Sequence, residues 1–266
     1  MRQEHQKIPF AKRSLGQNFL TDPKVIRRIV DALDPSGSDI VLEIGPGRGA
    51  LTGELVDRSA RVYALEFDRG MARLLRERFG ERPNFTLIED DALHIDFGSI
   101  EPDDAKLRLI ANLPYNISTA ILQRLFDYTH AFQDCVLMFQ REVADRIMAK
   151  PGTKDRGYLT VLVETHFKVE RLFDVAPEAF RPAPKVWSTV VRLVPKEELI
   201  PEPAAFQSLV AASFAQKRKT ILNNLKTKYP DAEHMLLRAG VDTSRRAETL
   251  SLDEWRCLAG VIACPT

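Results

Sequence analysis

The sequence lacks the features that mark exported, membrane-spanning or disulfide-stabilised proteins. Its three cysteines, in 266 residues, never form the CxxC spacing of a redox or zinc motif. No stretch approaches the roughly 18 uncharged apolar residues that a membrane span needs, and the first residues contain no apolar core of a signal peptide. The five histidines fall in unrelated contexts. We therefore expect a protein of the reducing cytoplasm, with no membrane contact and no metal site.

What is present is the composition of an ordinary globular protein with an uneven charge distribution. Hydrophobic residues make up 44% and charged residues 28% of the chain, whose net charge is only +1. The amino end is basic, residues 31–104 are acid-rich, and Lys217, Arg218 and Lys219 begin a basic run without acidic residues. A polyanion could contact the basic regions. On charge alone, a solvated helix face explains each cluster equally well.

Short apolar runs alternate with segments of helical period between residues 39 and 140, which predicts a parallel sheet with crossover helices. The expected strands are 40–44, 62–65, 85–88, 107–110 and 136–139, with a late strand at 186–194. Helical spacing then follows at 206–214, 221–229, 232–239 and 252–263. The sequence thus predicts an α/β fold, with a Rossmann-like sheet domain at residues 1–198 and a small all-helical, RNA-binding domain at 199–266.

A glycine-rich turn, Gly45-Pro46-Gly47-Arg48-Gly49, follows the first expected strand, where backbone without Cβ atoms can approach a ligand closely. Glu66 ends the second strand, where a carboxylate can accept both ribose hydroxyls of a nucleotide, and Asp91 after the third strand can accept from an adenine amino group. Because carboxyl ends of parallel strands share one edge, Gly45, Gly47, Glu66 and Asp91 should line one crevice. A nicotinamide site, a purely structural glycine turn, and a helix-cap or turn carboxylate at Asp91 remain alternatives.

Asn112-Leu113-Pro114-Tyr115 follows the fourth strand at the same edge and is the strongest chemical signal in the chain. An adenine amine is a poor nucleophile because its lone pair is delocalised into the ring, so an enzyme must hold its hydrogens on placed acceptors. Asn112 supplies a side-chain carbonyl, and the Leu113 backbone carbonyl, beside the constrained Pro114, supplies a second. Tyr115 offers a flat face for the base. This motif predicts methylation of an amine.

With these residues in view, the chain resembles the ribosomal RNA adenine dimethyltransferase family, the bacterial small-subunit enzymes linked to kasugamycin resistance. The resemblance runs almost from end to end. The segments that carry it are 16–20, 45–49, 91–93, 112–118, 180–186, 214–220 and 246–248. One local departure is Asp90, where many relatives carry glycine.

The resemblance implies S-adenosylmethionine as the methyl donor, a cofactor that needs no metal and no strong general base. The cofactor contacts that it implies come from Asn18, Leu20, Gly45, Glu66, Asp91 and Asn112. It places the target adenine between Tyr115 and Phe180. It implies a substrate of two adjacent adenosines in the 3′-terminal hairpin loop of small-subunit (16S) ribosomal RNA, within an assembling 30S particle. We expect a monomer that holds RNA phosphates with Lys217, Arg218 and Lys219.

Three other functions have to be weighed. A large-subunit ribosomal RNA adenine methyltransferase of the antibiotic-resistance type shares the sheet, the glycine turn and a similar acceptor motif, although the tail that begins at Phe214 favours the small-subunit enzymes. A non-enzymatic ribosome assembly factor would not need Asn112, Tyr115 and Glu66 together. A dehydrogenase is disfavoured because the acceptor motif has no place in hydride transfer.

Overall fold

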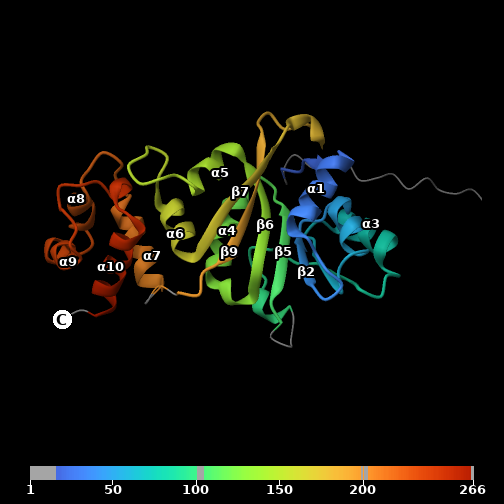
Figure 1. Cartoon of the computed structure of the whole chain (residues 1–266), viewed down its shortest axis with the longest axis horizontal. Coiled ribbons are helices and arrows are strands. Elements are labelled where there is room, and N and C mark those ends of the chain that lie inside the picture. Colours follow the sequence, from blue (N-terminus) through green and yellow to red (C-terminus); the bar gives the residue numbers. More distant parts are fainter. Residues whose placement is uncertain (1–15, 101–104, 199, 201–202, 265–266) are drawn as a thin grey trace, which may run out of the picture. The chain divides into compact units, whose positions relative to one another are not determined.

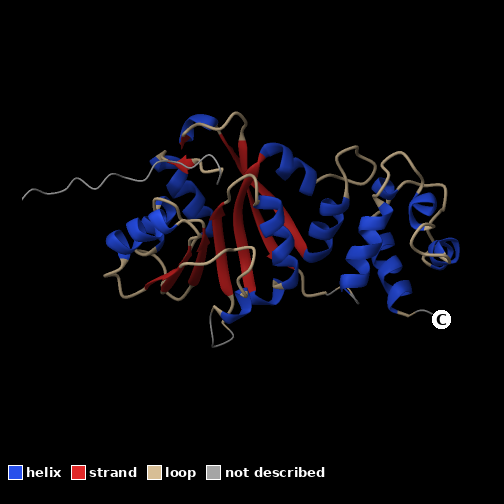
Figure 2. Cartoon of the chain, turned by 180° about the vertical axis from the view of Figure 1, so that it is seen from behind, coloured by secondary structure: helices blue, strands red, loops and turns tan. Residues whose placement is uncertain are grey.

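A seven-stranded sheet with the order β4-β3-β2-β5-β6-β9-β7 forms the centre of the fold (Figures 1 and 2). The computed structural model describes residues 16–100, 105–198, 200 and 203–264. The strands are β2 (Ile40–Ile44), β3 (Arg61–Leu65), β4 (Phe85–Ile88), β5 (Leu107–Asn112), β6 (Phe132–Gln140), β7 (Phe167–Val175) and β9 (Ser188–Pro195). Strands β2 to β6 pair in parallel, whereas β9 is antiparallel to β6. The α/β prediction and its five parallel strands are confirmed, and β7 is a strand that the sequence did not predict.

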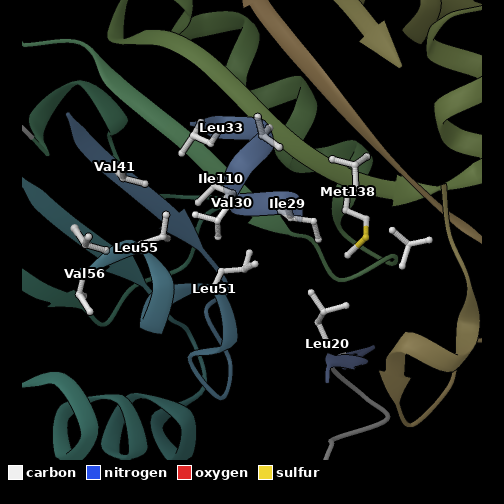
Figure 3. Close-up of a cluster of buried hydrophobic side chains, with 14 of the residues drawn as sticks. Leu20, Ile29, Val30, Leu33, Val41, Leu51, Leu55, Val56, Ile110 and Met138 are labelled. Carbon is white, nitrogen blue, oxygen red and sulfur yellow. The ribbon is translucent and has the colours of Figure 1, made fainter. Parts of the chain in front are cut away.

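Strands β2, β3, β5 and β6 read as apolar runs because consecutive residues, and so both faces, are buried. The helices that follow them are α2 (Ala50–Leu55), α3 (Arg69–Phe79) and α4 (Ser118–Asp127), and α1 (Pro23–Leu33) precedes the sheet. Figure 3 shows Ile29, Val30 and Leu33 of α1 beside Val41 and Ile110 of the sheet, all of them buried. Alternate strand residues point to opposite faces. A strand that is buried on both faces therefore lacks the alternation of apolar and polar residues that a half-exposed strand has.

A short strand near the amino end forms a separate two-stranded sheet with a strand from residues 180–181. Strand β1 (Phe19–Leu20) pairs antiparallel with β8 (Phe180–Arg181), and Leu20 lies opposite Phe180. The Thr21 N–H also donates to the Ala179 carbonyl at 2.8 Å. This pairing fixes the segment around residue 18 against the main sheet unit.

The chain divides into two compact units, and the division differs in part from the predicted one. One unit comprises Met1–Arg141 and Glu170–Val194, and the other Glu142–Val169 and Pro195–Thr266. The predicted boundary after residue 198 lies close to the division after Val194. Residues 142–169 were assigned to the sheet domain, but they group with the helical tail.

The second unit is built from short helices around buried aromatic rings. They are α5 (Arg141–Ile147), α6 (Tyr158–His166), α7 (Pro203–Ser213), α8 (Ile221–Leu225), α9 (Ala232–Arg238) and α10 (Leu252–Ala263). Phe206 and Trp255 are fully buried and meet edge to face, with ring centroids 6.4 Å apart. Across the described part of the chain, no helix has both the length and the apolar character that crossing a membrane requires.

Arg108 of β5 ties together four segments at the amino edge of the sheet. Its guanidinium donates to both carboxylate oxygens of Asp134, at 2.8 and 2.9 Å, and to Asp39 at 3.0 Å. It also donates to the backbone carbonyls of Leu33 and Asp34 at the end of α1. Its side chain is only 12% exposed. Arg108 therefore closes the end of α1 while it neutralises two carboxylates.

We predict that Arg108→Met lowers the free energy of unfolding by about 3–5 kcal/mol, because it leaves Asp39 and Asp134 without the cation that bridges them. Arg82→Met is the matched control. Arg82 pairs with Asp57 at 2.6 Å, but these side chains are 50% and 61% exposed, so the loss should stay below about 1 kcal/mol. Chemical denaturation of both variants measures the difference, and equal losses would contradict a structural role for Arg108.

Candidate active site

Two adjoining hollows lie at the carboxyl edge of the parallel strands. They share Gln17, Gly45, Glu66 and Pro114, so they form one continuous crevice. The first is also lined by Asn18, Leu20, Glu43, Gly47, Asn112, Leu113 and Tyr115, and the second by Asp90, Asp91 and Phe67. The structure therefore brings together every residue predicted for the cofactor and the acceptor except Phe180.

The glycine turn between β2 and α2 needs the conformations that glycine allows. Gly45 and Gly47 have φ angles of +66° and +56°, in the left-handed region. A Cβ on Gly47 would also come within 3.0 Å of the Phe19 ring. The Gly47 N–H donates to a Glu66 oxygen at 3.0 Å. The turn is thus held open as a bare backbone surface beside a carboxylate.

Glu66 follows β3 and is 6% exposed. Its second oxygen accepts the Asp68 N–H at 2.8 Å. Burial raises the pKa of Glu66, and the backbone hydrogen bonds from Asp68 and Gly47 offset part of that rise. The backbone N–H of Phe67 also bonds to this carboxylate, which has about four acceptor positions in total. Glu66 therefore keeps acceptor capacity for a ligand hydroxyl without giving up the bonds that position it.

Glu43 is a residue of the crevice for which the sequence suggested no role. It lies within β2, is 2% exposed and accepts a hydrogen bond from the Thr52 hydroxyl at 2.6 Å. Burial, with a further contribution from nearby Glu66, raises the pKa of Glu43 to about 8. The sequence does contain a signal for this residue: Glu43 is the single charged residue of an otherwise apolar strand. A buried carboxylate without a partner is costly, so its presence there indicates a role.

Asn112 is the last residue of β5, and its amide has a defined orientation. The side-chain nitrogen donates to the backbone carbonyl of Asn18 at 3.2 Å. Among the described residues, none donates to the side-chain oxygen of Asn112. Because one end of the amide is fixed, the other end is presented as an acceptor in the first hollow.

Tyr115 is held by a second residue that the sequence did not indicate. Its hydroxyl lies 2.6 Å from the hydroxyl of Ser188 at the start of β9. Burial raises the pKa of Tyr115, so the phenol stays neutral at physiological pH. The following turn is closed by the Ile117 N–H, which donates to the Pro114 carbonyl, and it leads into α4. The ring thus has a fixed place beside Asn112.

Asp91 lies in the second hollow but is also bonded locally. One oxygen accepts the Leu93 N–H at 2.9 Å, and the other lies 3.1 Å from a ring nitrogen of His94. Neighbouring Asp90, the departure from the family pattern, accepts the Asp91 N–H at 2.7 Å. These local contacts are those of a turn carboxylate, the alternative role that the sequence allowed for Asp91. A role of Asp91 in binding adenine remains a prediction.

Phe180 does not lie where its predicted role requires. Its side chain is 0% exposed and belongs to the same buried cluster as Leu20 and Met138. It lines neither hollow. The placement of the target base against Phe180 is therefore corrected: in this conformation the ring has no exposed face on which a base could stack.

The basic cluster Lys217, Arg218 and Lys219 lies in the second unit, between α7 and α8, and all three residues are exposed. Buried Asn224 donates to the backbone carbonyls of Ser213 and Gln216 at 2.7 and 3.1 Å, which holds this loop in place. The cluster is thus an ordered basic surface.

Two further expectations concern other groups. The basic residues expected at the amino end include Lys7, Lys12 and Arg13, which lie outside the described residues. Among the described side chains, no group of three or more His, Cys, Asp or Glu lies close enough together to hold a metal ion.

Comparisons with known proteins agree with this geometry. The family model described as ribosomal RNA adenine dimethylase matches residues 10–263. Ribosomal RNA small subunit methyltransferase A of Aromatoleum aromaticum is 41% identical over 256 residues, which cover 95% of this chain and 94% of that protein. A dimethyladenosine transferase from Plasmodium falciparum has a similar structure, with a TM-score of 0.78 and 28% identity over 90% of this chain and 95% of that one. The 23S rRNA methyltransferase ErmE has a TM-score of 0.68 and 31% identity, with coverages of 91% and 98%.

The raised pKa of Glu43 predicts a pH dependence of stability. In the unfolded chain Glu43 loses its proton at the ordinary pKa of 4.5, whereas in the folded protein it keeps the proton up to about pH 8. The free energy of unfolding is therefore highest below pH 4.5, and it falls as the pH rises from 4.5 through about 8. Glu43→Gln keeps a neutral polar group there and should make the free energy of unfolding fall less steeply. Denaturation between about pH 5 and about pH 9 measures this slope. Identical slopes for parent and variant would contradict it.

Proposed function

The chain belongs to the ribosomal RNA adenine dimethylase family, and we propose that it dimethylates N6 of two adjacent adenosines in the 3′-terminal hairpin loop of small-subunit (16S) ribosomal RNA. S-adenosylmethionine is the proposed methyl donor, and an assembling 30S particle in the cytoplasm is the proposed substrate. The observation that carries the proposal is the Asn112 amide, whose oxygen is presented at the crevice because its nitrogen is held by Asn18. The proposed state of the protein is a monomer.

The crevice fits S-adenosylmethionine on two counts. Gly45 and Gly47 leave backbone without Cβ atoms at the turn, and Glu66 offers carboxylate lone pairs beside it. When bound, the cofactor supplies an electrophilic methyl group on a cationic sulfonium. Glu66 would hold the ribose hydroxyls and Asp91 the adenine amino group. Asn18 and Leu20 would contact the cofactor from the segment that β1 fixes.

The acceptor half of the crevice orients an amine rather than deprotonating it. The Asn112 oxygen would accept one hydrogen of the adenine amine, and the Leu113 backbone carbonyl the other. Held in this way, the nitrogen lone pair turns out of conjugation and towards the methyl donor. Tyr115, fixed by Ser188, would support the base from one face. The proton released from the methylated amine would pass to water.

A base inside an RNA stem is out of reach of such a crevice, so the substrate adenosines have to be unpaired or flipped. Lys217, Arg218 and Lys219 would then bind backbone phosphates, which carry no sequence information but fix the position of the RNA. The buried Phe180 is better assigned to the small sheet that holds Leu20 at the crevice.

The second candidate is methylation of large-subunit RNA, which the likeness to ErmE keeps open. The small-subunit relative covers this chain at the higher identity of 41%. Mapping of the methylated nucleotide separates the two substrates. A non-enzymatic assembly factor would have no use for an amide oriented as Asn112 is.

We expect Asn112→Ala to reduce the single-turnover rate of methylation by about 100-fold or more, the scale for removing one preorganised polar group. The assay uses labelled S-adenosylmethionine and unmodified small-subunit particles, followed by nucleoside analysis. Asn84→Ala is the matched control, because the Asn84 side chain likewise donates to backbone carbonyls, those of Val56 and Ser59, but lies before β4 at the opposite edge.

The control variant should lose some stability and keep the parent rate. If Asn112→Ala retains near-parental methylation, or loses it only in proportion to unfolding, the acceptor assignment is wrong. If the parent produces no dimethyladenosine in the particle, the proposed function is wrong.

Reversing the charges of Lys217, Arg218 and Lys219 should weaken RNA binding and lower its dependence on salt by about two to three units of the logarithmic slope, because fewer counterions are released. Cofactor affinity should not change. The control reverses three exposed arginines of the acid-rich segment, Arg69, Arg73 and Arg82. The RNA role is refuted if the variant keeps the salt slope of the parent.

A further inference from the structure

Trp187 is a large aromatic side chain left on the surface, although the chain buries its other tryptophan completely. It is 45% exposed, and its neighbour Val186 is 44% exposed, whereas Trp255 is 0% exposed. Both exposed residues lie in the loop between β8 and β9. The reaction as described so far does not use this loop. An exposed indole in a fixed loop is a stacking surface for a flat ligand.

A cation covers part of this indole and holds it in position. The guanidinium carbon of Arg141 lies 4.7 Å from the centroid of the Trp187 ring. Arg141 is itself fixed by an ion pair with Asp174 at 2.8 Å. Its backbone N–H donates to the Trp187 carbonyl at 2.9 Å. The tryptophan is therefore preorganised by its backbone and by its ring.

The position of Trp187 is set by the acceptor site. The next residue, Ser188, bonds the Tyr115 hydroxyl at 2.6 Å and is fully buried. Ser188 pairs with Gln140, two positions beyond Met138, which pairs with Asn112. The start of β9 thus lies at the same edge as the acceptor loop, and Figure 1 shows the segment before β9 at the end of the sheet where β6 leads into α5.

The charge of this loop suits a nucleic acid. No acidic residue occurs between Glu178 and Glu197. Arg181, at the end of β8, and Lys185, in the loop, are both exposed, and no described residue forms an ion pair with Lys185. An aromatic face flanked by such cations matches the way in which proteins bind unpaired nucleotides, with stacking for the base and positive charge for the phosphates.

We propose that Trp187, backed by Arg141, stacks on the base adjoining the adenosine that occupies the acceptor site. The inference rests on the proposed function. A nucleotide withdrawn from its stack leaves its neighbour without a stacking partner, and an exposed aromatic ring can replace that partner. Because the proposed substrate has two adjacent adenosines, the neighbouring base would be the other target. Trp187 is then a positioning residue that holds one adenosine while its neighbour is methylated.

The test compares Trp187→Ala, Trp187→Phe and Val186→Ala in methylation of unmodified small-subunit particles, with KM and kcat measured separately. Loss of one base–aromatic stack should raise the KM for particles by about 5- to 150-fold in Trp187→Ala. The kcat should change little, because this contact is made before the reaction as well as during it. Trp187→Phe keeps a ring and should stay near the parent. Val186→Ala removes an equally exposed apolar side chain from the same loop and should also stay near the parent.

S-adenosylmethionine affinity should match the parent in all three variants, and each should stay folded at the assay temperature. Trp187→Ala also removes the contact of the ring with Arg141, so its melting curve is measured to confirm that the folded protein is assayed. The same KM in Trp187→Ala and Val186→Ala, with an active parent, would overturn the stacking role and leave the proposed function standing. Failure of the parent itself to dimethylate the particles would overturn both.

Discussion

A single buried carboxylate organises the crevice on which the function depends. Glu66 accepts the N–H of Gly47 with one oxygen and that of Asp68 with the other, so it joins the glycine turn after β2 to the chain after β3. Asp68 in turn accepts from Gly70 at the start of α3 and from the Gln17 side chain. The glycine turn and the chain after β3 are therefore held by Glu66, and Asp68, which Glu66 fixes through its backbone, holds Gln17 and the start of α3. Without Glu66, the turn would lose the bond that fixes its bare backbone.

In the acceptor half of the crevice, residues that are distant in the sequence orient the side chains of Asn112 and Tyr115. Asn112 is turned by a backbone carbonyl at residue 18, and Tyr115 by a hydroxyl at residue 188. Together these two bonds decide which atoms of Asn112 and Tyr115 face the crevice. Strand β9 contributes because it runs antiparallel to β6 and so begins at the edge where the parallel strands end. Ser188 therefore fixes two features: it bonds the Tyr115 hydroxyl, and it ends the loop that carries Trp187.

The sheet and the crevice were predictable because their cause is local in the sequence. Buried parallel strands are continuous apolar runs, and parallel strands place their following residues at one edge, so Gly45, Glu66 and Asn112 had to meet. The remainder depends on tertiary contacts. Strand β1 is too short to show a period, and the grouping of residues 142–169 with the tail is a matter of packing. The role of Phe180 was implied by the resemblance alone, and the burial of its ring is a tertiary feature that the matching segment does not show.

The central claim, that Glu66 both builds the crevice and binds the cofactor, is tested most directly by calorimetric titration of S-adenosylmethionine into parent and Glu66→Ala proteins. Hydrogen bonds to a charged group contribute about 1.5–3 kcal/mol, so the affinity should fall by about 10- to 150-fold. RNA affinity should change little. Cofactor affinity equal to that of the parent, in a folded variant, would remove Glu66 from the binding site and contradict this account.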